Sequence, residues 1–189
     1  MDNHSTLCAI VLAAGNSSRF GSNKLLHEVE DMPMYQHITD LIIKLKVDCA
    51  IIVTKYPEIV SRVKDKFTVV INEQTLWGQS YSMQLGIKAA QQKGIFDGFL
   101  FCVSDQPYLS LASLQKLRAV WQVKGGICAL SYRGKRGNPV IFSAEYLNEL
   151  MSVRGDQGGR SIIKRHLNEL TLVEAVDERE LYDIDLPIV

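Results

Sequence analysis

The sequence has no excess of charge of either sign. Lys and Arg together number 21, Asp and Glu together also number 21, and the formal net charge is +0. General nucleic-acid binders and proteins of membrane surfaces usually carry a basic excess, so we expect the chain to belong to neither class. Any anion site must therefore be a local concentration of positive groups.

Long apolar runs are absent as well. None approaches the roughly 20 residues that a helix needs to span a bilayer. The first residues, MDNHSTLCAIV, lack the basic-then-apolar order of a secretory signal. We therefore expect a cytoplasmic protein. The 189 residues are enough for a single domain, over residues 1–189, with a substantial core.

Clustered metal or disulfide ligands are also lacking. The four cysteines lie far apart in the sequence, each among apolar residues: Cys8, Cys49, Cys102 and Cys128. This pattern predicts reduced core thiols rather than a disulfide framework or a zinc site. The four histidines show no ligand spacing, which argues against a histidine metal cluster.

What the sequence does contain is a regular alternation of short apolar runs and amphipathic segments. The runs predict buried strands at residues 7–13, 50–54, 68–71, 98–103, 126–132, 139–142 and 172–175. Helical spacing is found at residues 34–46, 58–66, 80–92, 144–151 and 158–167, and RGKRGN at 133–138 reads as a turn. Such an alternation predicts one three-layer α/β domain, Rossmann-like, with a mainly parallel sheet covered on both faces.

The first expected strand leaves through a polar loop, GNSSRFGSNK. Neither the dinucleotide fingerprint nor the P-loop pattern fits, because five residues separate Gly15 from Gly21 and Leu25 follows Lys24. Glycines nevertheless let backbone N–H groups approach phosphate oxygens closely, and Arg19 and Lys24 add positive charge. The loop therefore suggests a phosphate site, with an exposed solvated loop as the alternative.

Aspartates follow the apolar run 98–103 and occur again near the C-terminus. Asp105 follows the apolar run 98–103 after a single serine, at a place where an unpaired charge is costly and Mg²⁺ is a natural partner. The alternative is that Asp105 caps the helix beginning near Ser110, although Ser110 itself suits that position. In the C-terminal DIDLPIV, Asp183 and Asp185 lie on one side if the segment is extended, which favours a cation between them.

Two further stretches have polar residues of uncertain role. In NEQTLWGQSYSM, Asn72 ends an expected strand, and Gly78 and Ser82 stand at a helix start, where serines often serve only as caps. In YRGKRGNPVIFS, three cations suit an anionic second substrate or, equally, a basic surface turn: Arg133, Lys135 and Arg136.

The loop LAAGNSSRFGSNK resembles the signature LAAGxSxRFGxxK of nucleotidyltransferases with a dinucleotide-binding-like fold. Within that superfamily the chain is most similar to the molybdenum cofactor cytidylyltransferases and their MobA-like relatives. The DQP at residues 105–107, the G-x-P ending at Pro139 and the GDQGGR at 155–160 match the family's motifs. The resemblance runs from Leu7 to Pro187 and implies the GT-A-like nucleotidyltransferase fold.

The resemblance implies roles for individual residues. Arg19, Lys24 and Asp105 would be catalytic, and Asp105 and Asp185 would bind Mg²⁺. The nucleotide would be bound by Leu12, Ala13, Ala14, Gly15, Ser17, Arg19, Lys24, Asn72, Gly78 and Ser82. The second substrate would contact Gly137, Pro139, Gly155, Asp156, Gly158 and Arg160, although Asp156 alone could be a helix cap. The C-terminus departs from the family pattern, with Leu186 in place of a threonine, which weakens the case for Asp185.

The activity implied is transfer of CMP from CTP to the terminal phosphate of molybdenum-loaded molybdopterin, with release of pyrophosphate. The Leu-Ala-Ala-Gly start favours CTP over GTP. A chaperone or apoenzyme of the xanthine dehydrogenase type would then receive the product. Three alternatives stay open: a guanylyltransferase of the same cofactor, a sugar- or alditol-phosphate nucleotidyltransferase, and a carrier that binds without turnover.

Overall fold

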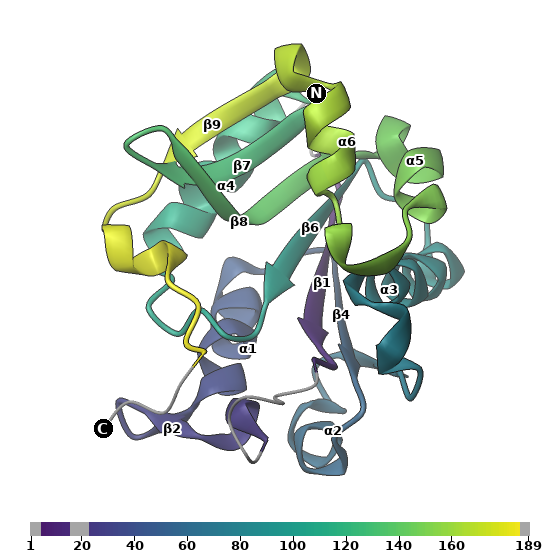
Figure 1. The fold of residues 1–189 in the computed structure, drawn as a ribbon, viewed down its shortest axis with the longest axis vertical. Helices are drawn as coiled ribbons and strands as arrows, with labels where there is room; N and C mark the ends of the chain where they lie inside the picture. Colours follow the sequence, from purple (N-terminus) through teal and green to yellow (C-terminus); the bar gives the residue numbers. More distant parts are fainter. Residues whose placement is uncertain (1–4, 16–22, 186–189) are drawn as a thin grey trace.

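The protein folds around one seven-stranded sheet (Figure 1). The structure is a computed structural model that describes residues 5–15 and 23–185. The strand order is β5-β4-β1-β6-β8-β7-β9. The strands are β1 (Leu7–Ala13), β4 (Cys49–Thr54), β5 (Thr68–Ile71), β6 (Gly98–Val103), β7 (Ile127–Tyr132), β8 (Lys135–Ser143) and β9 (Leu170–Glu174). All neighbouring pairs are parallel except those made by β8, which runs opposite to β6 and β7.

Helices cover both faces of this sheet. The α-helices are α1 (Met34–Leu45), α2 (Pro57–Val63), α3 (Gln79–Lys93), α4 (Leu111–Lys124), α5 (Leu147–Ser152) and α6 (Arg160–Arg165). Short 3-10 turns are η1 (Lys24–Leu26), η2 (Thr75–Trp77), η3 (Ala144–Tyr146), η4 (Gly155–Gln157), η5 (Leu167–Glu169) and η6 (Glu178–Leu181). A two-stranded hairpin, β2 (Glu28–Val29) with β3 (Met32–Pro33), lies outside the main sheet.

The two-residue period of the strands divides the core into two layers. In β1, Leu7, Ala9 and Val11 pack with α1, α2 and α4, whereas Cys8 and Ile10 face α3, α5 and α6. The predicted three-layer α/β fold with a mainly parallel sheet is therefore confirmed. No helix of the described part of the chain is long and apolar enough to cross a bilayer.

Helix α4 was absent from the sequence-based set of elements, apart from its expected start. Ser110 is its N-cap, and its hydroxyl oxygen accepts a hydrogen bond from the Ser113 amide, as the sequence suggested. The helix buries Leu117 and Trp121 against the sheet but also carries Val123, which is exposed. Apolar residues on more than one face blur the helical period, which is why the pattern was missed.

The hairpin between β7 and β8 is tighter than predicted. The sequence suggested a turn over residues 133–138, but β8 already begins at Lys135 and pairs with Tyr132. The turn is therefore only Arg133 and Gly134, both with positive φ. This change matters because it places Arg136 inside a strand rather than on a surface turn.

All four cysteines are free thiols, as predicted. Cys8 of β1 and Cys49 of β4 are neighbours across these two strands, and Cys102 lies in strand β6 of the sheet. Burial raises the pKa of the Cys102 thiol above its ordinary value. A thiol held protonated in this way packs as a small apolar side chain.

Candidate active site

The carboxyl ends of β1 and β6 lie side by side and define one edge of the sheet. Leu12 pairs with Val103 in register, so the residues that follow each strand emerge together. The Ser104 hydroxyl donates to the Leu12 carbonyl at 2.9 Å, and the Thr54 hydroxyl donates to the Ala13 carbonyl at 3.0 Å. These side chains fix the end of β1, where ligands bind in open α/β sheets.

Two cavities open at this edge. The loop cavity, of 400 Å³, lies beside the end of β1 and the start of α3. It is lined by residues that include Leu12, Ala14, Gly15, Lys24, Thr75, Leu76, Gly78, Ser82, Asp105 and Asp156. The fold thus brings most of the predicted nucleotide-binding residues to one space. Ser17 and Arg19 lie outside the described residues.

Two predicted nucleotide-binding residues do not line the loop cavity but support its wall. Ala13 is buried within the sheet. Asn72 is also buried, and its amide nitrogen donates to the Ser82 hydroxyl at 2.8 Å while its oxygen accepts from the Gln74 amide at 2.9 Å. Asn72 therefore fixes the approach to α3, and its role toward a nucleotide stays a prediction.

Lys24 joins the loop cavity to the C-terminal segment. Its ammonium nitrogen lies 2.8 Å from an oxygen of Asp105, 3.4 Å from an oxygen of Asp185 and 3.3 Å from the Ile184 carbonyl. Burial lowers the pKa of Lys24, but the hydrogen bonds and charges of Asp105 and Asp185 outweigh that effect and leave the pKa above its ordinary value. Lys24 is therefore held charged between two carboxylates.

Asp183 was paired with Asp185 in the sequence analysis, but the resemblance gave it no role. Together with Asp105 it lines the second of the two cavities, which is described below as the arginine cavity. Its carboxylate accepts a hydrogen bond from the side-chain amide of Gln106 at 2.8 Å. Burial raises the pKa of Asp183, and the charge of Asp105 raises it further. The resemblance selected Asp185 within the DID motif, whereas the structure brings both aspartates toward Asp105 and Lys24.

The segment that carries these aspartates is held by a buried glutamate. Glu180, in η6, is 2% exposed, and its carboxylate accepts hydrogen bonds from the Ser110 amide and hydroxyl and from the amides of Val176 and Asp177. The Ile184 amide then donates to the Asp105 carbonyl at 2.9 Å. These bonds join the C-terminal segment to the end of β6.

The carboxylates are of the kind that a divalent cation such as Mg²⁺ prefers. Mg²⁺ is typically held by one or two protein carboxylates together with substrate phosphates, and Asp105 with Asp183 or Asp185 supplies such hard oxygen donors. The described residues contain no group of three or more His, Cys, Asp or Glu suited to a metal. When bound, the ion would supply positive charge at the phosphate oxygens.

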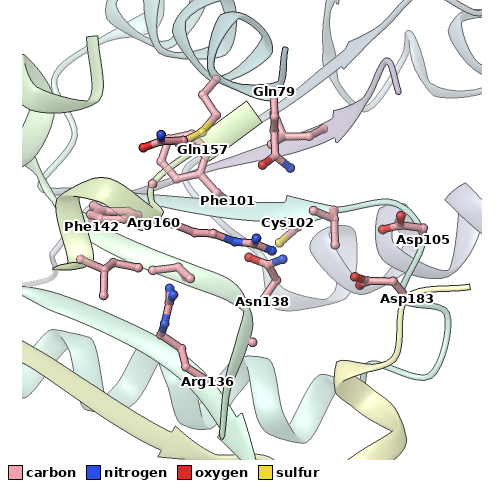
Figure 2. A pocket seen from close by; sticks show the side chains of 17 residues that line it. Gln79, Phe101, Cys102, Asp105, Arg136, Asn138, Phe142, Gln157, Arg160 and Asp183 are labelled. Carbon is pink, nitrogen blue, oxygen red and sulfur yellow. The ribbon is translucent and has the colours of Figure 1, made fainter. Parts of the chain in front are cut away.

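The second cavity, the arginine cavity, lies next to the loop cavity and encloses 180 Å³. Leu12, Gln79, Val103 and Asp105 line both cavities. Figure 2 shows Arg136 of β8 and Arg160 of α6 directed into this space, with Asp105 and Asp183 at its other side. Arg133 and Lys135, the other cations of the hairpin, are exposed and do not line it.

The loop that leads into α6 is packed against the start of α3. An Asp156 carboxylate oxygen accepts a hydrogen bond from the Gln79 amide at 3.2 Å, so Asp156 caps α3 and not the helix that follows it in sequence. A Cβ on Gly78 would lie 2.5 Å from the Gly155 carbonyl carbon, and one on Gly158 would lie 2.7 Å from the Gln79 side-chain oxygen. Glycine at these positions permits the close approach.

The other residues expected to contact the second substrate differ in position. Gly137 and Arg160 line the arginine cavity, but Pro139 does not, and Asp156 lines the loop cavity. A Cβ on Gly137 would lie 2.8 Å from a Leu181 methyl carbon, so this glycine also permits η6 to pack on β8. Sequence motifs alone could not separate packing from ligand contact.

Helix α6, which carries Arg160, is fixed at its far end by a polar cluster. The two ring nitrogens of His166 lie 2.7 Å from Glu149 and 3.1 Å from Glu169, and Arg165 also pairs with Glu149. Tyr146 donates a hydrogen bond to Glu169. Hydrogen bonds that the carboxylates of Glu169 and Glu149 accept from the ring raise the pKa of His166, because they stabilise its charged form.

Comparison with known proteins identifies the family of the chain. Residues 9–170 match the family model described as the MobA-like NTP transferase domain. The chain is 26% identical over 192 residues to the purine catabolism protein PucB of Bacillus subtilis (strain 168), covering 96% of this chain and 92% of PucB.

Solved structures show the same fold. A nucleotidyl transferase from Methanothermobacter thermautotroptrophicus, Mth528, superposes with a TM-score of 0.80 at 23% identity, over 96% of this chain and 92% of that one. The manganese complex of Rv0371c from Mycobacterium tuberculosis H37Rv gives 0.75 at 21% identity, over 90% and 89%. The family model spans most of the sequence, so the chain belongs to the MobA-like NTP transferase family.

Proposed function

We propose that the protein transfers CMP from CTP to the terminal phosphate of molybdenum-loaded molybdopterin, releasing pyrophosphate. The observation that carries the proposal is the pair of adjoining cavities that share Asp105. One has Ala14, Gly15 and Lys24, which suit a triphosphate, and the other has two arginines, which suit an anionic acceptor. A nucleotidyl transfer needs two such sites that meet at the reacting phosphorus.

The chain's own residues supply positioning and charge. The triphosphate lies along Ala14, Gly15 and Lys24, with its base toward Gly78 and Ser82, and the acceptor lies in the arginine cavity. An acceptor phosphate oxygen forms a bond to the α-phosphorus, and the bond from that phosphorus to the pyrophosphate oxygen breaks. The attacking phosphate is already ionised near neutral pH, so no side chain has to remove a proton. Lys24 stabilises the negative charge of the departing pyrophosphate.

Two observations support the finer assignment. Ala14, which lines the loop cavity, gives the loop the Leu-Ala-Ala-Gly start that resembles CTP-using members. PucB is described as a purine catabolism protein, and xanthine is a purine, which is compatible with delivery of the product to an enzyme of the xanthine dehydrogenase type. Mg²⁺, held by Asp105, is the metal we propose, and the related Rv0371c is described in complex with manganese.

The test is pyrophosphate release from CTP, GTP, ATP and UTP in the presence of Mg²⁺ and molybdenum-loaded molybdopterin, with Asp105→Ala as the control. We expect release with CTP, and its loss in the variant and after removal of the metal. Release with GTP instead would assign the guanylyl activity. If the protein bound nucleotide but released no pyrophosphate with any acceptor, sugar phosphates included, the result would contradict the proposal and identify a carrier.

A further inference from the structure

Two of the four cysteines face each other across neighbouring strands. Cys8 of β1 is paired in register with Cys49, the first residue of β4. The two strands are parallel, so this pair lies toward their amino ends, whereas Leu12 at the other end of β1 leads into the cavities. Neither cysteine lines either cavity, and the proposed transfer uses neither thiol.

Both side chains lie on the same face of the sheet. Residues in register on parallel strands direct their side chains to one side, and both cysteines pack in the apolar layer that includes Ile87 and Ala90 of α3. The two thiols also act on each other. Hydrogen bonding between them lowers the pKa of Cys49 and raises that of Cys8.

The two cysteines differ in exposure. Cys8 is 0% exposed, whereas Cys49 is half-buried and can be reached from solvent. The positive charge of Lys93, the last residue of α3, lowers the pKa of Cys49 further, although burial and the charge of Asp48 oppose this. A thiolate is the form of cysteine that reacts with oxidants, so Cys49 is the reactive member of the pair.

The other two cysteines lack these features. Cys102 is paired with Val11 of β1, and Cys128 is paired with Ile141 of β8 and Thr171 of β9. Both are buried, and burial raises the pKa of each thiol. They therefore serve as controls within the same molecule.

We propose that Cys8 and Cys49 form a reversible oxidation site, in which Cys49 reacts with a peroxide and Cys8 then closes a disulfide with it. The inference goes beyond the proposed function and does not depend on it. The resting state of the pair is the free thiols seen in the structure.

The chemistry balances with hydrogen peroxide as the oxidant. The Cys49 sulfur forms a bond to one peroxide oxygen, the O–O bond breaks and hydroxide leaves, which gives a sulfenic acid. The Cys8 sulfur then forms the S–S bond, the S–O bond breaks, and water leaves with the proton of the Cys8 thiol. The two sulfurs lose two electrons, and the peroxide gains them. Closure of the disulfide protects Cys49 from oxidation to the sulfinic acid, which is not reversed by thiols.

The geometry permits this disulfide but strains it. Neighbouring strands lie about 4.8 Å apart, within the range of about 4.4–6.8 Å that separates the Cα atoms of disulfide-bonded cysteines. The Cβ atoms of a disulfide are about 3.8 Å apart, so the two residues must approach each other by about 1 Å. Strain of this kind makes a disulfide easier to reduce, which suits a reversible site.

The test is made on the full chain, reduced and then freed of reductant. The protein is treated with an equimolar amount of hydrogen peroxide, unfolded in iodoacetamide, digested with trypsin and analysed by mass spectrometry without reduction. Cleavage after Arg19, Lys46 and Lys55 places the two cysteines on different peptides. We expect these peptides to be joined, two hydrogens lighter than their sum, in a yield that does not depend on protein concentration and is lost with dithiothreitol.

Variants separate the two roles. In the folded, reduced protein Cys49 should react with iodoacetamide at least about tenfold faster than Cys102 or Cys128. In Cys8→Ala, Cys49 should be trapped by dimedone as the sulfenic acid and pass to the sulfinic acid with excess peroxide. In Cys49→Ser, Cys8 should stay reduced. Circular dichroism shows whether each variant is folded, and if one is not, the wild-type cross-link decides.

Three results would overturn the inference. One is recovery of Cys49 as a thiol or a sulfinic acid in the wild type, with no cross-link to Cys8. Another is a disulfide that forms only between molecules, which removes the role of Cys8. The third is alkylation of Cys49 no faster than that of Cys102 and Cys128. None of these results bears on nucleotidyl transfer, which is tested separately by pyrophosphate release.

Discussion

Replacing Lys24 by Met should strengthen metal binding and weaken turnover at the same time. The ammonium group lies among the oxygens to which a cation would bind, 2.8 Å from Asp105 and 3.4 Å from Asp185. Met retains most of the side-chain volume and removes the charge. The free protein would therefore lose a competitor for its own carboxylates, whereas the proposed transfer would lose the positive group that is to stabilise the leaving pyrophosphate.

The size of the effect on metal binding follows from these distances. A unit charge pair 2.8 Å apart attracts by about 6 kcal/mol at an effective dielectric constant of ~20, and by about 1.5 kcal/mol in bulk water. The side chains of Lys24 and Asp105 are only 15% and 24% exposed, whereas that of Asp185 is 60% exposed and well screened, so we take the bulk-water figure as the lower bound of the effect. About 1.5 kcal/mol corresponds to roughly tenfold tighter binding.

The assay is a titration of Mn²⁺ into the free protein without nucleotide, followed calorimetrically, together with pyrophosphate release under the same conditions. Lys24→Met should bind Mn²⁺ about tenfold more tightly and release pyrophosphate about 100- to 1000-fold more slowly. Lys116→Met is the control, because that lysine lines neither cavity and donates to the Glu174 carbonyl. Unchanged or weaker Mn²⁺ binding in Lys24→Met would refute the proposed competition.

Three further changes test how the site is supported. Gly78→Ala should lower both stability and turnover more than Gly134→Ala does. Backbone strain is the same in both variants, because φ is 81° at Gly78 and 78° at Gly134, and it costs about 1–2 kcal/mol in the free energy of unfolding measured with urea. Only the Cβ added at Gly78 also meets a backbone atom, which belongs to Gly155. Glu180→Gln should cost about 1–3 kcal/mol by the same measurement, because four donors lose their carboxylate; an unchanged midpoint would contradict that role. His166 has a raised pKa, so the stability that its charged form contributes is present below about pH 6.5 and is lost as the pH rises through the folded-state pKa. Between about pH 6 and pH 8.5 the wild type should therefore lose more unfolding free energy than His166→Gln. Parallel stability curves for the two proteins would rule this out.

Much of the fold was predictable from the sequence, because burial imposes a period on the chain. The runs at 7–13, 68–71 and 98–103 agree with β1, β5 and β6 as they stand in the structure, and buried parallel strands read as continuous apolar runs. The loop after β1 and Asp105 also stood out in the sequence, since polar residues soon after such a run need a chemical reason, and their role toward a ligand stays a prediction. Helix α4 was missed because its apolar residues are not confined to one face.

Which residues line the arginine cavity could be decided only by the tertiary structure. In the sequence Arg133, Lys135 and Arg136 are three equivalent cations of one turn, yet β8 directs only Arg136 into the cavity. The start of β8 at Lys135 depends on its pairing with β7, a contact that no local pattern specifies.

The same holds for the charges around Lys24. The sequence by itself determined that an α/β sheet would carry a glycine loop, a lysine and an aspartate at one edge, because strand period and loop chemistry are local properties. It did not determine that Asp156 caps α3, or that Asp183 faces Asp105 from a segment nearly eighty residues away. Those neighbours are set by the packing of whole elements, since a hydrogen bond or a charge acts over a few ångströms in space and not along the chain.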